Sequence, residues 1–157
     1  EEERKLDGFV LGDVYQGKLA ASPHRNRFVQ AIYKAKILTF YEQSGEHWNL
    51  VKEIQESFPK YKYNSPAIET DTPVGYLDVC ATEKYVYALY SGKNYRDDKD
   101  AAFSGYTIEV YGWDGTLQKR YQSDVPLKVI EVSKDDGSLY AIAYHPDPVL
   151  VRFPLNL

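Results

Sequence analysis

The side chains able to do chemistry are few in this sequence and lie far apart. The three histidines, His24, His47 and His145, form neither an H-x-H nor an H-E-x-x-H pair, so sequence neighbours build no zinc site. Cys80 is the only cysteine and lies in an apolar run without an adjacent basic residue, which is typical of a buried structural thiol. No G-x-S-x-G, P-loop or G-x-G-x-x-G motif is present. The sequence therefore predicts no catalytic residue, no metal site and no cofactor.

The most polar stretch is 93–100, which reads Lys-Asn-Tyr-Arg-Asp-Asp-Lys-Asp. Asp97, Asp98 and Asp100 could supply oxygen ligands to calcium, but the D-x-D-x-D-G spacing is missing and two basic residues of the stretch oppose a cation. A solvated insertion between two strands explains the same charges. We predict the insertion rather than a calcium site.

The elements that must position these loops are β-strands. Aromatic residues make up 15% of the chain, and apolar and polar positions alternate, as in Ile108–Tyr111. The turn signals Ser44–Glu46, Asp114–Gly115 and Asp136–Gly137 separate the apolar runs. Only Trp48–Ser57 also fits a helical turn, and its position within the repeat described below favours a strand. The chain is predicted to be all-β.

Composition narrows the classes of function. A length of 157 residues fits about one domain, and the formal charge of 19 − 23 = −4 argues against a broad nucleic-acid surface. No apolar run reaches the roughly 18 residues of a transmembrane helix. The chain has no Met, and residues 1–5 are charged where a signal peptide would be apolar. We therefore expect it to begin after a processing site, such as that of a removed signal, or inside a longer sequence.

An internal repeat predicts the architecture. Val29–Ile32, Val86–Leu89 and Leu139–Ile142 share an alanine at the third position, and the spacings between these alanines are 88 − 31 = 57 and 141 − 88 = 53. Each segment follows another apolar run and precedes an alternating one, and the first two units continue into a fourth run. Four antiparallel strands that recur every fifty-odd residues are the pattern of a β-propeller blade. A chance similarity within a sandwich or barrel is the alternative.

The repeat predicts a single partial propeller of about three blades. They span residues 18–57, 75–123 and, incompletely, 127–157, with 1–17 as a possible outer strand of a neighbouring or partner blade. Closed propellers need about four to eight blades, so a stack of three exposes an apolar face at each end. We expect either the C-terminal half of a longer propeller or two copies that close a six-bladed ring. In the second case Phe9–Tyr15 would complete the partner's third blade.

Loops at one end of the predicted blades supply the candidate binding residues. The loops that join second to third strands, and fourth strands to the next blade, surround the central channel on one face, where a rigid scaffold presents them. Tyrosine offers contact area and a hydroxyl, which suits protein or glycan surfaces, whereas covering the scaffold is the alternative role. The candidate ligand-binding residues are Tyr61, Tyr63, Tyr95, Arg96, Phe103 and His145.

Three segments resemble the TolB-like six-bladed β-propeller proteins of Bacteroides-type bacteria. They are Tyr85–Lys93, Ile108–Gly115 and Ser138–Ala143, which read YVYALYSGK, IEVYGWDG and SLYAIA. The resemblance is good over residues 75–157 and faint before them. It implies the propeller fold and a secreted lipoprotein of the cell envelope, periplasmic or on the surface, generally without an assigned activity. A member of that family would run to six blades, which makes it longer than this chain.

Together these observations predict a non-enzymatic binding or scaffolding propeller of the bacterial cell envelope, which recognises a protein or a glycan through one loop face. One alternative is a carbohydrate-active hydrolase or lyase whose catalytic residues lie on blades outside this chain. Another is a purely structural subunit. Two carboxylates, or a carboxylate and a histidine, about 5–10 Å apart at the channel mouth would favour the enzyme. Nucleic acid is not an expected partner, and closing the ring needs another chain segment or a second copy.

Overall fold

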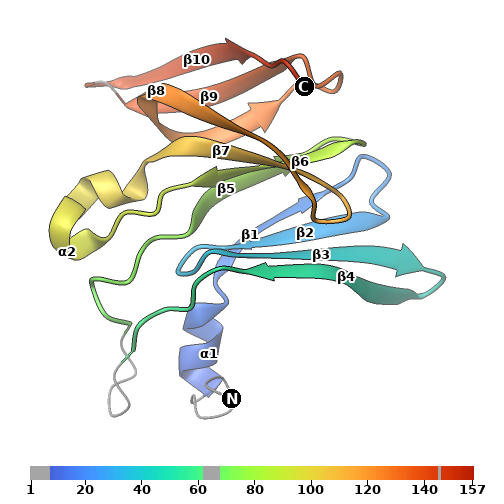
Figure 1. Cartoon of the computed structure of the whole chain (residues 1–157), viewed down its shortest axis with the longest axis horizontal. Helices are drawn as coiled ribbons and strands as arrows, with labels where there is room; N and C mark the ends of the chain where they lie inside the picture. Colours follow the sequence, from blue (N-terminus) through green and yellow to red (C-terminus); the bar gives the residue numbers. More distant parts are fainter. Residues whose placement is uncertain (1–7, 62–67, 145) are drawn as a thin grey trace.

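The computed structural model describes residues 8–61, 68–144 and 146–157, with side chains from Leu11 onward. These residues form two antiparallel sheets, one with four strands and one with six, which Figure 1 shows spread apart on one side of the molecule. The first sheet has the order β1 (Gly17–Ala21), β2 (Arg27–Ile32), β3 (Ile37–Ser44) and β4 (His47–Gln55). The second has the order β10 (Pro148–Pro154), β9 (Ser138–Tyr144), β8 (Leu117–Val132), β7 (Gly105–Gly112), β6 (Tyr85–Tyr90) and β5 (Tyr76–Ala81).

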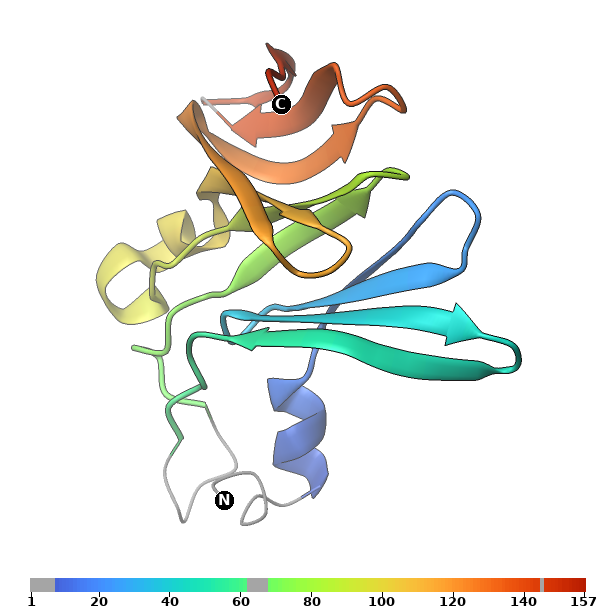
Figure 2. The same ribbon diagram turned by 45° about the vertical axis from the view of Figure 1, so that its right-hand side comes forward.

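The strand β8 belongs to two blades. Its first half, Leu117–Gln122, pairs with β7, and its second half, Leu127–Val132, pairs with β9. Figure 2 shows the sharp bend between the halves, where the Ser123 hydroxyl donates to the Val125 carbonyl at 2.8 Å. The sequence predicted two separate strands over this stretch, one for the second blade and one for the third. The structure contains both, joined as one bent strand. We call β1–β4 the first blade, β5 to the first half of β8 the second, and the second half of β8 to β10 the third.

The innermost strands of the three blades lie side by side. β5 contacts β1 on one side and the second half of β8 on the other. Close backbone approach brings the blades together: a Cβ at Gly75 would lie 1.9 Å from the Ala35 carbonyl oxygen, so only glycine fits there. This arrangement confirms the predicted fold class, an all-β partial propeller of about three blades.

Each blade closes its first turn with the same hydrogen bond. A Ser or Thr directly after the first strand accepts, on its hydroxyl oxygen, the backbone N–H at the start of the second strand. The three bonds run from Arg27 to Ser22 at 3.3 Å, from Tyr85 to Thr82 at 3.1 Å and from Ser138 to Ser133 at 2.9 Å. The donor lies five residues after the acceptor in the first and third blades but three residues after it in the second, which hides this part of the repeat in the sequence.

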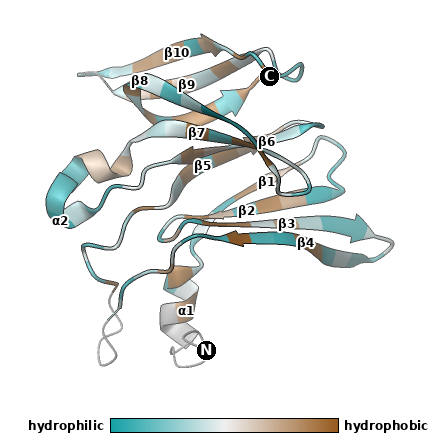
Figure 3. Ribbon diagram, in the orientation of Figure 1, coloured by the Kyte–Doolittle hydropathy of each residue, from teal (hydrophilic) through white to brown (hydrophobic). Residues whose placement is uncertain are grey.

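The core lies between the blades. Figure 3 shows the hydrophobic residues concentrated on the strands that face a neighbouring blade, whereas the helical turn α2 (Tyr95–Asp98) is hydrophilic. The three alanines of the repeat, Ala31, Ala88 and Ala141, are 0%, 0% and 3% exposed. A small residue at these positions lets the second strand of each blade approach its neighbour closely.

The N-terminal segment corrects one expectation. Gly8–Val14 is the helix α1, whereas an outer strand was expected within residues 1–17. Val14 is fully buried, and Tyr15 packs against Ile32, Ala35 and Ile37 at the edge of the first blade (Figure 1). A strand here would need a blade edge for its backbone hydrogen bonds, whereas a helix forms them internally. Within the described ranges, no helix is both long enough and apolar enough to cross a membrane.

Candidate functional site

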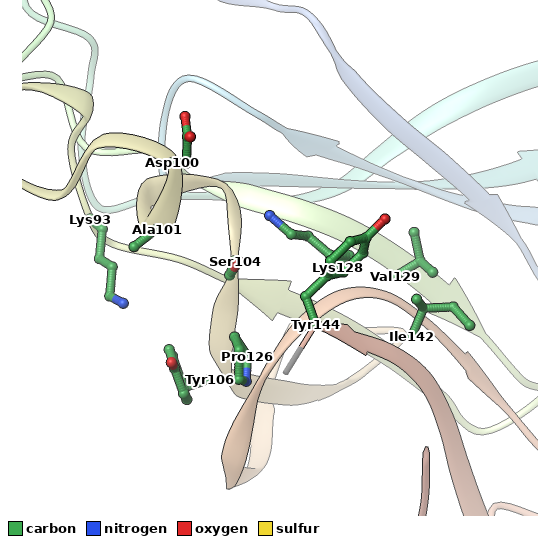
Figure 4. A pocket seen from close by; sticks show the side chains of 10 residues that line it. All are labelled: Lys93, Asp100, Ala101, Ser104, Tyr106, Pro126, Lys128, Val129, Ile142 and Tyr144. Carbon is green, nitrogen blue, oxygen red and sulfur yellow. The ribbon is translucent and has the colours of Figure 1, made fainter. Parts of the chain in front are cut away.

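A groove of about 740 Å³ lies where the second and third blades meet, on the face that carries the connection between β6 and β7. Figure 4 shows ten side chains that line it. Those that matter most for binding are Lys93, Asp100, Tyr106, Lys128, Val129 and Tyr144.

One wall of the groove is the connection between β6 and β7. It folds into α2 and the 3-10 turn η2 (Lys99–Phe103). Asn94 caps α2, because its side-chain oxygen accepts the Asp97 N–H at 3.0 Å. The Ser91 hydroxyl donates to the Ala102 carbonyl at 2.6 Å and ties the end of the connection to β6. The insertion predicted over 93–100 is thus an ordered helical wall that presents Asp100 to the groove.

The opposite wall is the second half of β8 with the end of β9. Val129 pairs with Ile142, and the register shifts between Leu127 and Val129. A residue added to a ladder in this way turns the side chains next to it. Lys128 and Val129 both line the groove, while Leu127 is fully buried. The bulge therefore presents a lysine and an apolar side chain to the same groove.

Two ammonium groups dominate the electrostatics of the groove. Lys93 Nζ lies 4.6 Å from the centre of the Tyr106 ring, and Lys128 Nζ lies 5.7 Å from that of Tyr144. Such positions over a ring face are favourable for a cation. Lys128 Nζ also donates to the Phe103 carbonyl at 2.6 Å. Within the described residues neither lysine forms an ion pair.

Two of the predicted binding residues form an aromatic cluster beside the groove. The Tyr95 and Phe103 rings are 5.9 Å apart, and the Phe103 ring is stacked on Tyr33 at 6.4 Å with an interplanar angle of 8°. We call Tyr33, Tyr95 and Phe103 the aromatic shelf. The shelf meets the groove at Phe103, whose carbonyl holds Lys128.

Arg96 has a structural role next to the shelf. Its guanidinium lies 3.0 Å from Asp71, and its backbone N–H donates to the Thr70 carbonyl at 3.0 Å. The hydrogen bond from Lys60, followed by the charge of Arg96, lowers the pKa of the Asp71 carboxyl. Arg96 therefore ties the connection between the first two blades to α2.

Tyr61 lies apart from the groove. It is half-buried and its ring meets the edge of Phe58 at 6.5 Å, beside the first blade. Tyr63 and His145 lie outside the described residues. The structure thus brings Tyr95, Arg96 and Phe103 together and leaves Tyr61 separate. Sequence reasoning missed Lys93, Tyr106, Lys128 and Tyr144, although the last precedes the predicted loop residue His145.

A second cluster of titratable groups is buried between the first and second blades. Glu109 is 1% exposed and accepts hydrogen bonds from Tyr76 and Tyr111 at 2.8 Å, Arg120 at 2.9 Å and Lys36 at 3.0 Å. Burial raises the pKa of Glu109, but these bonds outweigh it and hold that pKa below its usual value. Burial raises the pKa of both tyrosines. With its carboxylate fully partnered, Glu109 serves the packing of the two blades.

The remaining candidates agree with a structural role. Cys80 is 6% exposed and burial raises its pKa, which confirms the predicted buried thiol. The His24 ring is largely exposed and lies 3.5 Å from Glu83. Across residues 8–61, 68–144 and 146–157, no three His, Cys, Asp or Glu side chains gather closely enough to hold a metal ion. Among the side chains that line the groove, Asp100 is the one carboxylate described.

Comparisons with known proteins agree with this architecture. The family model described as TolB-like 6-blade propeller-like matches residues 23–135. The β-propeller domain of Cps50 (Swd1) from Myceliophteria thermophila is similar in structure, with a TM-score of 0.57 and 11% identity. The match covers 88% of this chain and 40% of that one, so the chain spans well under half of its length. At this identity the similarity concerns the fold. None of the curated proteins matches the chain in sequence.

Proposed function

The chain belongs to the TolB-like 6-blade propeller-like family, and on that premise we propose that it is a non-enzymatic binding or scaffolding propeller whose loop face recognises a protein or a glycan. The observation that carries the proposal is the groove of about 740 Å³ between the second and third blades. Its volume falls in the range of roughly 300–1,000 Å³ that is usual for ligand sites. Its walls stand on two packed blades, which hold them in place.

The aromatic shelf extends the binding surface beyond the groove. Phe103 contributes its ring to the shelf and its carbonyl to Lys128 in the groove wall, so the two parts are continuous. Tyr95 is 46% exposed, and Lys99 Nζ lies 5.6 Å from the centre of its ring. Such a combination of exposed aromatic rings and ammonium groups suits the recognition of sugars or of protein side chains.

A groove-blocking variant tests this proposal. Ala101→Trp places a large side chain at an exposed position of the groove wall. Lys134→Trp adds the same bulk to an exposed turn between β8 and β9, away from the groove, and is the matched control. We expect ligands found on a glycan microarray or by pull-down of solubilised envelope proteins to be lost with Ala101→Trp and kept with Lys134→Trp. Binding that Ala101→Trp leaves intact would contradict the use of this groove.

The outer faces of the end blades support a scaffolding role. Leu19 and Leu50 on the first blade are 64% and 60% exposed, and Leu150 on the third is 67% exposed. We propose that another chain segment or a second copy covers these faces and closes the ring; on the third blade it would adjoin the groove, because Leu150 pairs with Ile142 in the groove wall. Light scattering compared with the denatured intact mass tests this directly. A native mass near twice the denatured one indicates two copies, and an unpaired chain that stays monodisperse would contradict the idea.

We further propose that the protein acts in the bacterial cell envelope, periplasmic or at the surface. The resemblance of Tyr85–Lys93, Ile108–Gly115 and Ser138–Ala143 to envelope propellers supports this placement. Fractionation of the bacterium that makes the protein is the test. Recovery with the cytoplasmic fraction would contradict it.

A further inference from the structure

We infer that the outer edge of β10 binds a short β-strand of the chain segment that closes the ring, and that this strand places an apolar side chain in a pocket between the second and third blades. The inference rests on the ring closure proposed above and names the part of the third blade that receives the closing segment. It follows from the sheet pairing, from the pocket beside β10 and from a comparison with the fourth strand of the second blade.

The third blade is one strand short of its neighbours. In the first blade β4 pairs with β3, and in the second the first half of β8 pairs with β7. β10 takes the place of β3 and β7 in the third blade, and in the part of the chain that the structure describes it pairs with β9 alone (Figure 1). Its other edge therefore presents backbone groups that an added strand can bond.

The backbone of β10 offers two N–H groups to such a strand. The Leu155 N–H, just beyond β10, donates to the Gly137 carbonyl at 3.1 Å. Because these groups alternate along a strand, the odd-numbered residues of β10 point their N–H towards β9 and the even-numbered residues point theirs towards the free edge. Among the even-numbered positions Leu150 and Arg152 carry an N–H, whereas the prolines at both ends of β10 do not. The added strand is therefore short and is centred opposite Val151.

A small apolar pocket opens beside β10. Its volume is about 180 Å³, and it lies between the outer strands of the second and third blades. Its lining includes Ile108, Tyr121, Leu139 and Phe153. Ile108 and Leu139 belong to the buried core, whereas Tyr121 and Phe153 are half-buried at its outer end. A cavity of about 150 Å³ can hold a benzene molecule, so this pocket has room for one large apolar side chain.

The second blade shows which residue of a fourth strand faces such a pocket. There Arg120 lies opposite Glu109 and donates to its carboxylate at 2.9 Å. Val151 takes the place of Glu109 in the third blade, because the two residues pair with the equivalent alanines Ala141 and Ala88. Val151 is half-buried against the core between the second and third blades. The residue opposite it therefore faces the second blade, and an apolar side chain rather than an arginine is complementary there.

The next position of the added strand favours an acidic residue. The Arg152 guanidinium donates to the Ser138 hydroxyl at 2.8 Å and lies 5.9 Å from the centre of the Tyr140 ring. Within the described ranges it forms no ion pair. Residues directly opposite each other in a sheet share a face, so a carboxylate opposite Arg152 would be complementary to it.

A second copy does not fit this edge as well as another chain segment does. Every strand of the described residues already pairs within a sheet, so a second copy could offer only the outer edge of its own β4 or β10. The apolar side chains that these strands would direct into the pocket, such as Ile54 or Val151, are already packed against the copy's own blades. The closing strand therefore comes from a segment whose side chains are free to enter the pocket.

Amide hydrogen exchange with a fused strand tests the inference. The strand Lys-Val-Glu-Leu-Thr-Val-Lys, joined to Leu157 by a flexible Gly-Ser linker, can pair with β10 so that its Glu lies opposite Arg152 and its Leu opposite Val151. We expect the exchange of the Leu150 and Arg152 amides to slow about tenfold or more. The Val151 amide already points towards β9 and is the internal reference. The matched control has Asp in place of the Leu and should leave the exchange of both amides unchanged, because a carboxylate is unfavourable in the apolar pocket.

The same two amides are then measured in the assembly isolated from the bacterium that makes the protein. Their protection in an assembly that contains another chain segment supports the inference. Free exchange in an assembly heavier than one chain overturns it and leaves ring closure through the blade faces standing. Protection in an assembly of two copies overturns it in favour of the second copy. Equal protection by the Leu and Asp strands overturns the role of the pocket. A single chain that stays monodisperse contradicts the proposed ring closure and this inference together.

Discussion

The two interfaces between the three blades are built from different chemistry. The first and second blades meet through a buried carboxylate with four hydrogen-bond partners, beside Phe40, Tyr76 and Tyr111. The second and third blades meet through an apolar core that includes Leu127, Leu139 and Tyr87. The three blades are built on the same repeat, yet the two interfaces between them differ in chemistry.

The difference follows the chain connections. The second and third blades share the strand β8, so backbone pairing already fixes how they lie relative to each other. The first and second blades are joined by residues 56–75, between the end of β4 and the start of β5. Hydrogen bonds to a buried charge are directional, whereas aliphatic contacts are not. We infer that the Glu109 cluster sets the relative position of the two blades that no shared strand aligns.

The largest expected effect comes from removing the buried carboxylate. Glu109→Ala leaves the Tyr76 and Tyr111 hydroxyls buried without their carboxylate acceptor and Lys36 with Glu56 as its remaining partner, and we expect it to lower the free energy of unfolding by about 3–5 kcal/mol. Urea unfolding measures this, and Glu53→Ala on the exposed strand β4 is the control. A loss below about 1 kcal/mol would show that the cluster is dispensable.

A truncation in the interface between the second and third blades should lower the free energy of unfolding by less, and the loss should not depend on salt. Leu127 is fully buried, so Leu127→Ala should lower the free energy of unfolding by about 2–4 kcal/mol through lost contacts and a cavity. Because no charge is involved, the loss should be the same at low and high salt. The control is Leu117→Ala at the 39% exposed start of β8. A loss that changes with salt would mean that the two interfaces do not differ as described.

Acid should act on the first interface through Glu109. The folded pKa of Glu109 is below its usual value, so its contribution is present above the unfolded pKa of about 4.3 and is lost as the pH falls through the folded pKa. Unfolding of wild type measured from pH 6 to pH 3 should show this decline. The isosteric Glu109→Gln should start less stable and decline less over the same range. Parallel curves for the two proteins would refute the assignment.

Sequence reasoning succeeded where local pattern decides the structure. The alternation of Ile108–Tyr111 and the Asp-Gly turns predicted strands, and His47–Gln55 forms the strand β4 rather than a helix. It failed for α1, whose sequence contains Gly8 and Gly12, both poor helix formers. That helix is stabilised instead by packing of Val14 and the following tyrosine against the first blade, a tertiary contact that the local pattern does not contain.

For the candidate site, too, the sequence predicted only the residues whose position follows from a local pattern. Tyr95 and Phe103 were predicted because they lie in a loop that a propeller places on one face. Lys128 and Tyr144 belong to strands, and they reach the groove only through the bulge at Leu127/Val129 and the register of β8 with β9. Neither feature has a signature in the sequence, since both depend on which residues of two strands become partners.

The smallest expected effect concerns a polar link between the second and third blades that the loss of one hydroxyl oxygen removes. The Tyr87 hydroxyl donates to Asp136 at 2.7 Å, and Asp136 also accepts from Thr82 at 2.8 Å. Tyr87→Phe keeps the buried ring and leaves Asp136 one partner, so we expect a loss of about 1 kcal/mol. Tyr140→Phe, at an exposed position of β9, is the control. If Tyr87→Phe cost as much as Glu109→Ala in the same urea experiment, the second interface would also depend on a directional polar contact. The shared strand β8 would then be insufficient to align its two blades.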